Sequence, residues 1–474
     1  MTLSPQLLAA LRCPFCGGGL SFSATRIPPL GAADFGILEC ACGSHPVVDG
    51  IPILLRAPVG EFEHQSGTLA ADGATPDQLV QLIGAGRENE ALARCLTYAP
   101  APAHRPGPPG AGLARRLAAT RLSRWLNRRR VRGSLLAKRH RLSGCDALRY
   151  FFQPRSPLGR HIGDYFVMRF GQPRHLAALS LLSNLAGDAK PLLDIACGAG
   201  HFEHYLTRRR DPARVIGVDI NYFELWIARH WIAPAADFVC CDAHDGLPFS
   251  DDAFAGIFCS DAYHYIRRRD ALLREIRRCA PGRMVVLTRV GNGAVGPHEG
   301  QELNIHGYVA EIGESALRVF DEVGLVRDYL ARRNPLTTSR DDLEEAGQSK
   351  WLSFVWNGPP AARNPAWEES DWPHGVGSLG VNPIYVATRL PDGALDLQFR
   401  FPGIWYAFEN GAMLSYQPRS LTLTRTDIER LRGSASEPLS RDLLRRFVLL
   451  GMPEHYVERS ALDGDSGLAG ADSA

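Results

Sequence analysis

Four cysteines near the N-terminus have the spacing of metal ligands. They form the pairs CPFC and CAC, at positions Cys13, Cys16, Cys40 and Cys42. In a chain without secretory features, cysteine pairs separated by a loop favour a metal site over disulfides. Four thiolates close a tetrahedral site and leave no open position, so we expect a structural zinc ion. His45 is near enough in the sequence to be a substitute ligand.

Three aspartates and a glycine-rich turn form a second group of residues that could do chemistry. The aspartates Asp194, Asp219 and Asp242 end the apolar parts of the segments PLLDIACGAGHF, RVIGVDIN and ADFVCCDAHDGL. Asp219 is at the distance from the turn where a carboxylate accepts hydrogen bonds from ribose hydroxyls. Gly198 and Gly200 let the backbone approach a ligand, and the helix that follows offers free amides.

The elements that must position these residues alternate between strands and helices. A fourth strand at 255–260 and a fifth after the Pro-Gly turn of RRCAPGRMVVLTRV continue the series. This alternation predicts a Rossmann-like α/β fold, a doubly wound parallel sheet that binds ligands at the carboxyl ends of its strands. A dinucleotide fold would need a third glycine where Glu203 stands, so NAD is disfavoured.

The motif series resembles that of class I S-adenosylmethionine-dependent methyltransferases. The resemblance covers residues 165–330 and rests on LLDIACGAGHF, VIGVDIN, CCDAHDGLPFSDDAFAGIFCSDAYHYI and the Pro-Gly before the fifth strand. It implies S-adenosyl-L-methionine as the cofactor. It assigns the methionine part of the cofactor to Asp194, Ala196, Gly198 and Gly200, and the ribose to Asp219 with Ile220. The adenine is assigned to Asp242 with Ala243, and the closing edge of the site to Ser260 with Asp261.

The N-terminal segments LRCPFCGGGL and CGSHPVVDGIPILL resemble the zinc-ribbon family of methyltransferase activator subunits, over residues 5–57. In that family the ribbon is a separate partner of a methyltransferase or is fused to one. The resemblance implies a zinc ribbon at 1–58 with no catalytic role. A linker and a basic amphipathic helical segment at 59–150 precede the methyltransferase domain at 151–390, so we expect the ribbon to be a separate unit.

A general base is the remaining catalytic question. Methyl transfer from a sulfonium depends mainly on orientation and on the exclusion of water. Where the acceptor is a hydroxyl or an acid, a base helps, and the candidates are His264 and Asp261, just past the fourth strand. His264 could instead be a packed histidine at a helix start, and His201 and Tyr263 are rivals for the role. The segment before the first motif either covers the cofactor or packs in the core, through Tyr165, Phe166 and Arg169.

The middle of the chain is basic. No acidic residue occurs between Ala91 and Cys145, and the segment 113–141 carries arginines throughout, including Arg128, Arg129 and Arg130. Three interpretations stay open: contacts to RNA phosphates, peripheral contact with an anionic membrane surface, or a solvated helix packed on the catalytic domain. Only three of the 53 basic residues are lysines, so we give arginine richness little functional weight.

The region after the fifth strand carries no motif of known chemistry. A tryptophan-bearing segment at about 331–378 is too long for a structureless loop, so we expect an insertion that either binds the acceptor as a lid or forms a mini-core. NPIY at 382–385 nearly matches a signature of adenine and glutamine N-methyltransferases, but it comes far too late and is read as coincidence. Residues 391–474 are expected to form an α+β extension with a disordered tail.

Composition limits the function classes. The 474 residues include 53 basic and 51 acidic side chains, so bulk charge does not predict a polyanion binder. No apolar run reaches the ~18 residues of a membrane span, and we expect a cytoplasmic protein. The expected function is methyl transfer to a small or medium acceptor, such as a specialised metabolite, a glycolipid or a saccharide. The alternatives are methylation of rRNA or tRNA, and a non-catalytic scaffold that binds a partner; the oligomeric state stays open.

Overall fold

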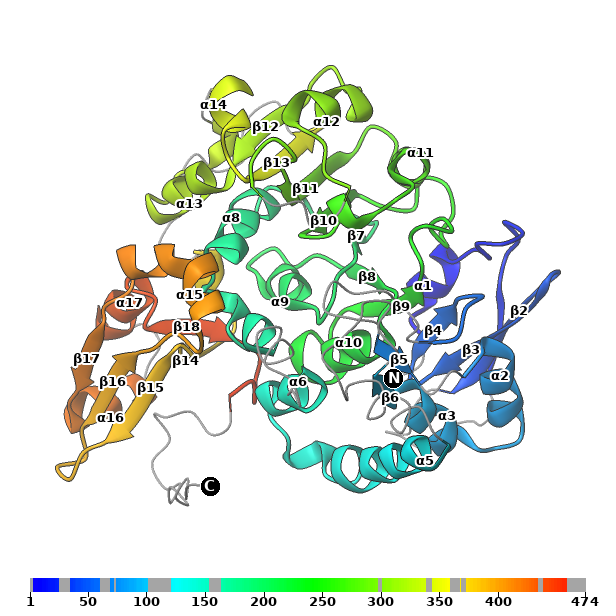
Figure 1. Cartoon of the computed structure of the whole chain (residues 1–474), viewed down its shortest axis with the longest axis horizontal. Helices are drawn as coiled ribbons and strands as arrows, with labels where there is room; N and C mark the ends of the chain where they lie inside the picture. The colour runs from blue at the N-terminus through cyan, green and yellow to red at the C-terminus, as the bar shows by residue number, and fades with distance from the viewer. Residues whose placement is uncertain are drawn as a thin grey trace, which may run out of the picture. The chain divides into compact units, whose positions relative to one another are not determined.

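The structure is a computed structural model that describes residues 3–24, 35–59, 69–71, 74–100, 121–152, 163–296, 301–337, 343–358, 367, 372–433 and 438–457. The chain divides into two compact units, residues 1–141 with 177–366 and residues 142–176 with 367–474 (Figure 1). The Pro-rich linker predicted before residue 113 lies outside the described residues from position 101, as does the C-terminal tail. In the described ranges, no helix has both the length and the apolar character that a bilayer crossing requires.

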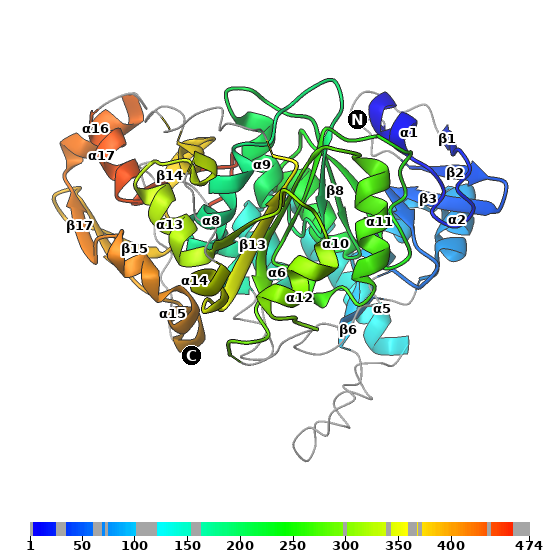
Figure 2. The ribbon, with the colours of Figure 1, turned by 90° about the horizontal axis from the view of Figure 1, so that it is seen from above.

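An eleven-stranded sheet forms the centre of the first unit (Figure 2). Its strands, in spatial order, are β1 (Ser21–Ala24), β2 (Gly36–Cys40), β3 (Gly43–Val48), β4 (Ile51–Leu54), β9 (Asp237–Cys241), β8 (Val215–Asp219), β7 (Leu192–Ile195), β10 (Gly256–Ser260), β11 (Met284–Gly291), β13 (Trp351–Trp356) and β12 (Arg318–Asp321). The strands from β4 to β11 are parallel, and β13 is antiparallel to both of its neighbours. The predicted Rossmann-like sheet is therefore confirmed.

Helices cover both faces of this sheet. α9 (His201–Arg208) and α10 (Tyr222–Ile227) lie on one face, and α11 (Arg269–Cys279) lies on the other (Figure 1). The other helical segments described in this unit are α1 (Pro5–Ala10), α2 (Pro76–Gly84), α3 (Glu88–Cys95), α5 (Arg121–Arg130), the end of α8 (Pro173–Leu182), α12 (Ile305–Ile312), α13 (Glu322–Leu330), α14 (Leu343–Gly347) and the short turns η1 (Val131–Leu136), η2 (Arg139–Arg141), η4 (Ala228–Ile232), η5 (Tyr263–Tyr265) and η6 (Pro335–Thr337). A separate two-stranded pair joins β5 (Leu69–Ala71) and β6 (Tyr98–Pro100).

The N-terminal ribbon belongs to the central sheet, which corrects the expectation of a separate unit. β4 pairs in parallel with β9, with Ile53 opposite Cys240 and Leu54 opposite Cys241. Leu7 and Val47 of the ribbon are buried in the same core as residues of α11. The segment PVVDGIPILL is apolar because its strand β4 packs in the central sheet as well as in the ribbon. There β4 covers the edge of β9, which would otherwise be exposed.

Asp49 anchors the turn between β3 and β4 on the helical layer. Its Oδ2 accepts a hydrogen bond from Trp226 Nε1 at 2.7 Å and lies 2.8 Å from His230 Nε2. The next residue, Gly50, has φ +74°, and a side chain there would collide with the Arg229 guanidinium. Burial acts to raise the pKa of Asp49, but the contacts with His230 and Trp226 outweigh it, so this pKa is lowered.

Asp49→Asn should lower the free energy of unfolding by about 1–3 kcal/mol at pH 7, because the buried Trp226 indole and the partly exposed His230 ring lose a charged acceptor. Urea unfolding measures the loss, and Asp77→Asn on the exposed side of α2 is the matched control. A lowered folded-state pKa contributes stability above the unfolded value of about 3.9, and this contribution disappears as the pH falls through the folded value. The difference between wild type and variant should therefore shrink below about pH 4; a difference constant down to pH 2 would contradict the anchor.

The segment predicted as an insertion at 331–378 is divided between the two units. β13 lies between β11 and β12 in the central sheet, where Trp356 is fully buried. In the second unit Trp372 packs against the rings of His374 at 4.5 Å and Phe447 at 5.7 Å. This corrects the expectation of one inserted element: the run WLSFVW is a buried sheet strand, and the tryptophans named here fill two cores.

The second unit confirms the predicted α+β extension. Its strands form the antiparallel pair β14 (Ser378–Val381) with β18 (Leu449–Met452), and the sheet β15 (Tyr385–Arg389), β16 (Leu395–Phe399) and β17 (Ser420–Leu423). Its helical segments are α6 (Gly144–Phe152), η3 (Arg169–Gly171), the start of α8 (Pro173–Leu182), η8 (Pro373–Gly375), α15 (Ile404–Asn410), η9 (Gly411–Ser415), α16 (Arg425–Gly433) and α17 (Pro438–Arg445).

The NPIY segment has a structural role in this unit. The side-chain nitrogen Nδ2 of Asn382 donates a hydrogen bond to the Phe447 carbonyl at 3.0 Å. The side-chain oxygen Oδ1 of Asn382 accepts one from the backbone amide of Ile384 at 3.1 Å. A fully bonded, buried side chain of this kind holds a turn, which fits the interpretation of the NPIY match as coincidence.

Candidate cofactor site and zinc site

The predicted cofactor residues lie at the carboxyl ends of four neighbouring parallel strands. Asp194 lies within β7, Asp219 ends β8, Asp242 follows β9 and Ser260 ends β10. These strands are adjacent in the order β9, β8, β7, β10. Because parallel strands place their carboxyl ends at one edge of the sheet, the fold brings the predicted residues together there.

The turn between β7 and α9 has the left-handed conformations that its glycines predict. Gly198 and Gly200 have φ values of 56° and 80°. A side chain at Gly200 would place its Cβ 2.8 Å from the Cβ of Ala228. Ala196, which stands where the methyltransferase family usually has a glycine, also has a positive φ of 60°. Such a conformation costs an alanine roughly 1–2 kcal/mol, and strain of this kind is concentrated at functional sites.

Asp219 ties the end of β8 to this turn. Its Oδ2 accepts a hydrogen bond from the Gly198 amide at 3.0 Å, and its Oδ1 accepts from the Asn221 amide at 2.8 Å. Burial raises the pKa of Asp219 to about 6, although these amides act to lower it. Ile220, which is also predicted at the site, lies between Asp219 and Asn221 in the sequence. Its carbonyl oxygen accepts a hydrogen bond from the Cys240 thiol at 3.5 Å.

Further buried carboxyl groups surround the same turn. Burial raises the pKa of Glu203 to about 7, and it raises the pKa of Glu224 well above its ordinary value. Glu224 accepts a hydrogen bond from the Asn221 side chain at 2.6 Å. Asp194 and Asp219 lie at the same turn, and a cation bound there would stabilise the ionised forms that burial disfavours.

The Asp242 carboxylate is oriented by a histidine that sequence reasoning missed. Its Oδ1 lies 2.7 Å from His244 Nδ1 and accepts from the His244 amide at 2.9 Å. Since the Arg267 amide donates to His244 Nε2 at 3.1 Å, the proton of a neutral ring is on Nδ1 and points to Asp242. Burial acts to raise the pKa of Asp242, but the His244 contacts outweigh it and the pKa is lowered. Ala243, between the two, is partly buried.

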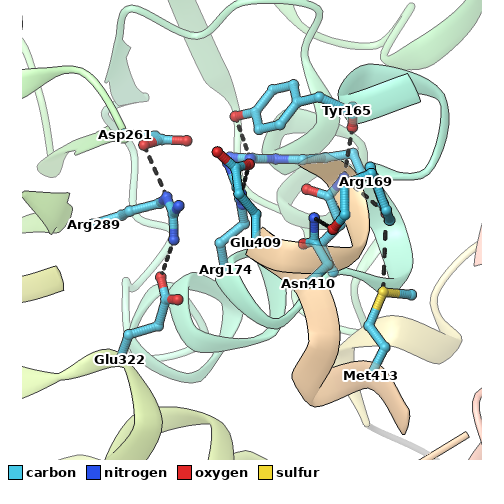
Figure 3. A network of polar contacts seen from close by, with 11 residues as sticks. Tyr165, Arg169, Arg174, Asp261, Arg289, Glu322, Glu409, Asn410 and Met413 are labelled. Atoms are coloured by element: carbon cyan, nitrogen blue, oxygen red, sulfur yellow. Dashed lines mark hydrogen bonds and ion pairs between the residues drawn. The ribbon is translucent and has the colours of Figure 1, made fainter. Parts of the chain in front are cut away.

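Asp261 is held in an ion-pair network that sequence reasoning also missed. Arg289 Nε donates to Asp261 Oδ1 at 3.0 Å, and its Nη1 donates to Glu322 Oε2 at 2.6 Å (Figure 3). The guanidinium is 5% exposed and lies 3.9 Å from the centre of the Trp351 ring. The Arg289 guanidinium thus fixes the orientation of the Asp261 carboxylate, and a catalytic role for Asp261 stays a prediction.

Arg289→Met should lower the free energy of unfolding by about 2–4 kcal/mol, since it leaves two partly buried carboxylates without their cation. Arg289→Lys should recover only part of this loss, because an ammonium cannot reproduce the two-pronged geometry. Thermal or urea unfolding of both variants makes the comparison. Equal stability of the methionine variant and the wild type would show that the network is not formed.

His264 lies deep in the fold. It is fully buried, and its ring centroid lies 4.0 Å from that of Tyr265 and 5.8 Å from that of Trp351. The rival Tyr263 donates its hydroxyl to Glu311 at 2.8 Å, and His201 is buried at the start of α9. This packing is what the alternative interpretation of His264, a packed histidine at a helix start, expects. A catalytic role for His264 stays a prediction.

Ser260 offers a polar group at the same edge of the sheet. Its hydroxyl oxygen is buried and has no protein partner among the described residues, and the same holds for the hydroxyl of Thr288. The two residues are opposite each other on β10 and β11. A buried hydroxyl without a partner is costly, so these positions favour a bound polar group.

The segment 163–176 forms a polar and aromatic cluster within the second unit. Arg169 donates to the Tyr165 hydroxyl, and the Phe166 ring stacks on Phe152 with centroids 4.6 Å apart. Arg174 donates to Glu409 Oε2 at 2.8 Å, and its guanidinium lies 4.9 Å from the centre of the Tyr165 ring (Figure 3). These contacts correspond to the core-packing alternative for Tyr165, Phe166 and Arg169.

The four N-terminal cysteines meet in one cluster. Their sulfurs all lie within 4.8 Å of one another, with Cys13–Cys42 at 3.5 Å, Cys40–Cys42 at 3.4 Å and Cys16–Cys40 at 3.9 Å. Tetrahedral zinc with Zn–S bonds of about 2.3 Å needs sulfurs about 3.8 Å apart, so the donor set is compatible with zinc. His45 Nε2 lies 3.7 Å from Cys13 Sγ, beside the cluster.

Comparison with known proteins agrees with this geometry. Residues 192–281 match the family model described as a methyltransferase domain. The phthiotriol/phenolphthiotriol dimycocerosates methyltransferase of Mycobacterium tuberculosis is 38% identical over 96 residues, which are 20% of this chain and 35% of that protein. The biotin biosynthesis bifunctional protein BioHC of Cellvibrio japonicus is 36% identical over 109 residues, 23% of this chain and 21% of that protein.

One solved structure with a similar chain is the complex of the Haloferax volcanii Trm112 methyltransferase activator with a protein described as a methyltransferase. The similarity has a TM-score of 0.31 and 19% identity, and it covers 42% of this chain and 95% of that one. The chain spans about a third of the length of the mycobacterial relatives that it matches. Residues 192–281 thus match a methyltransferase domain, and the sequence motifs around them resemble those of class I S-adenosylmethionine-dependent methyltransferases.

Proposed function

We propose that this protein transfers a methyl group from S-adenosyl-L-methionine to a small or lipid-like acceptor. The observation that carries the proposal is Asp219, fixed by the Gly198 and Asn221 amides at the end of β8. A carboxylate so placed beside a left-handed glycine turn is suited to accept hydrogen bonds from a ribose.

The residues of the turn fit the charge of this cofactor. Glu203 and Asp219 have pKa values raised by burial to about 7 and about 6, so their ionised forms gain from a nearby cation. When bound, S-adenosyl-L-methionine supplies an electrophilic methyl group, which an acceptor nucleophile takes up as the carbon–sulfur bond breaks and its electron pair stays on sulfur. Asp194, Gly198 and Gly200 would hold the methionine part, and Asp242 with Ala243 the adenine.

The remaining residues would orient the acceptor and exclude water. Ser260 offers its buried hydroxyl, and Arg289 holds the Asp261 carboxylate at the edge of the site. Where the acceptor must lose a proton, His264 is the candidate that would receive it. Zinc bound by the four cysteines would be structural, since four protein ligands leave no position for a substrate.

The acceptor class is proposed from the names of the relatives. Mycobacterial relatives are named for phthiotriol and phenolphthiotriol dimycocerosates, whereas the Cellvibrio relative is named for biotin biosynthesis. We therefore place a lipid-like acceptor first and a small metabolite second.

Incubation with methyl-labelled S-adenosyl-L-methionine tests the proposal. Purified protein is supplied in parallel with a lipid extract, a metabolite extract and total RNA from the source cells. Label is expected in the lipid or metabolite fraction, and the Asp219→Ala variant should transfer much less of it. The control variant Asp211→Asn, changed on an exposed loop, should transfer as much label as the wild type. Label only in RNA, or no label above that of Asp219→Ala, would contradict the proposed acceptor.

A further inference from the structure

Helix α5 and the π-helical turn η1 have an unusual distribution of apolar residues. Val131 and Leu135 are 4% and 0% exposed and fix the segment to the first unit. Trp125 and Leu126 are 43% and 52% exposed, so two large apolar side chains face the solvent. A surface helix ordinarily turns such residues toward the core, and their position outside marks an interaction surface.

The same segment also exposes several basic side chains. Arg129, Arg132, Lys138 and Arg141 are exposed, and the sequence between residues 91 and 145 contains no acidic residue. The Arg129 guanidinium lies over the Trp125 ring, 4.3 Å from its centre. Residues 125–141 therefore expose aromatic, aliphatic and basic side chains in one short segment, and we call these residues the α5 surface (Trp125, Leu126, Arg129, Arg132, Lys138 and Arg141).

We propose that the α5 surface docks on an anionic lipid bilayer. Helices that lie in the membrane interface combine basic residues with exposed tryptophan and leucine, which enter the boundary between headgroups and acyl chains. The indole ring suits this boundary, and clustered basic residues are attracted to anionic headgroups. RNA phosphates would also attract the arginines, but an exposed leucine gains nothing from a phosphate backbone, whereas a bilayer buries it. Docking of this kind does not require methyl transfer and stands independently of the proposed function.

Vesicle sedimentation with the full-length, zinc-loaded protein tests the α5 surface. Vesicles of phosphatidylcholine alone are compared with vesicles that contain phosphatidylglycerol. The wild type should bind the anionic vesicles at least tenfold more tightly at low salt, and this preference should fall as salt screens the charges. R129E/R132E/R141E should lose at least tenfold in affinity, while W125A/L126A should release the vesicles at a lower salt concentration than the wild type.

A matched charge change elsewhere separates this surface from a general charge effect. Arg425, Arg430 and Arg441 are exposed on α16 and α17 of the second unit, so R425E/R430E/R441E makes the same change in net charge. This control should bind as the wild type does. Equal losses for both triple variants would overturn the proposal, as would equal binding to neutral and anionic vesicles. Tight binding of transfer RNA at physiological salt, without binding to vesicles, would assign the surface to RNA instead.

Discussion

Cys13→Ser/Cys16→Ser is expected to release about one zinc ion per chain and to destabilise the whole first unit. The four sulfurs lie at distances compatible with a tetrahedral zinc site, so the loss of two ligands opens the site. Because β4 of the ribbon pairs with β9 and shares its core, the damage should extend beyond residues 1–58. The binding free energy of a structural zinc ion is in large part folding free energy.

Metal analysis and thermal unfolding of the same samples measure both effects. Cys279→Ser changes a buried cysteine of α11 outside the cluster and is the control. It should retain zinc, whereas the double variant should lose zinc and unfold at a lower temperature. Unchanged zinc content in the double variant would contradict the zinc site. Loss of zinc with unchanged unfolding of the first unit would show that the ribbon does not support the sheet.

Asp219→Ala should weaken the binding of S-adenosyl-L-methionine at least tenfold, on the order of 1.4 kcal/mol or more. The substitution removes the expected ribose acceptor and also the acceptor of the Gly198 amide, which orders the turn. Titration calorimetry with the cofactor measures the change. Unchanged affinity would remove the assignment of the site.

Asp219→Asn separates binding from stability. Since burial raises the pKa of Asp219 to about 6, above the unfolded value of about 3.9, its ionised form costs stability at pH 7 and this cost disappears as the pH falls through about 6 toward 4. The asparagine variant removes this cost, but one of the Gly198 and Asn221 amides then faces an amide nitrogen instead of an oxygen. The two effects oppose each other, so the stability at pH 7 should change less than in Asp219→Ala, while cofactor binding weakens. Wild-type cofactor affinity should also decrease as the pH falls through about 6. Affinity independent of pH between 7 and 5 would contradict this role of the carboxylate.

The strand ends and the glycine turn could be predicted from the sequence because their signals are local. The apolar strand that ends in Asp219, the one that Asp242 follows, and the glycines that permit positive φ at 198 and 200 can be predicted from a few neighbouring residues. The cysteine pairs are equally local, and the structure brings all four sulfurs together.

Contacts between distant segments could not be predicted in this way. Nothing in the ribbon sequence shows that β4 would pair with β9, more than 180 residues later, or that Asp49 would meet Trp226 and His230. Arg289 gave no signal because arginines are abundant throughout the chain, although it alone joins Asp261 to Glu322 in the described network. WLSFVW was missed as a strand because its tryptophans resembled a binding surface.

Titration of the purified, zinc-loaded protein with S-adenosyl-L-methionine and S-adenosylhomocysteine tests the central claim most directly. From the geometry around Asp219 we expect one cofactor molecule to bind per chain, with affinity reduced in Asp219→Ala and retained in Asp211→Asn. No binding of either compound to folded protein with a full complement of zinc would contradict the account and leave the methyltransferase fold as a scaffold.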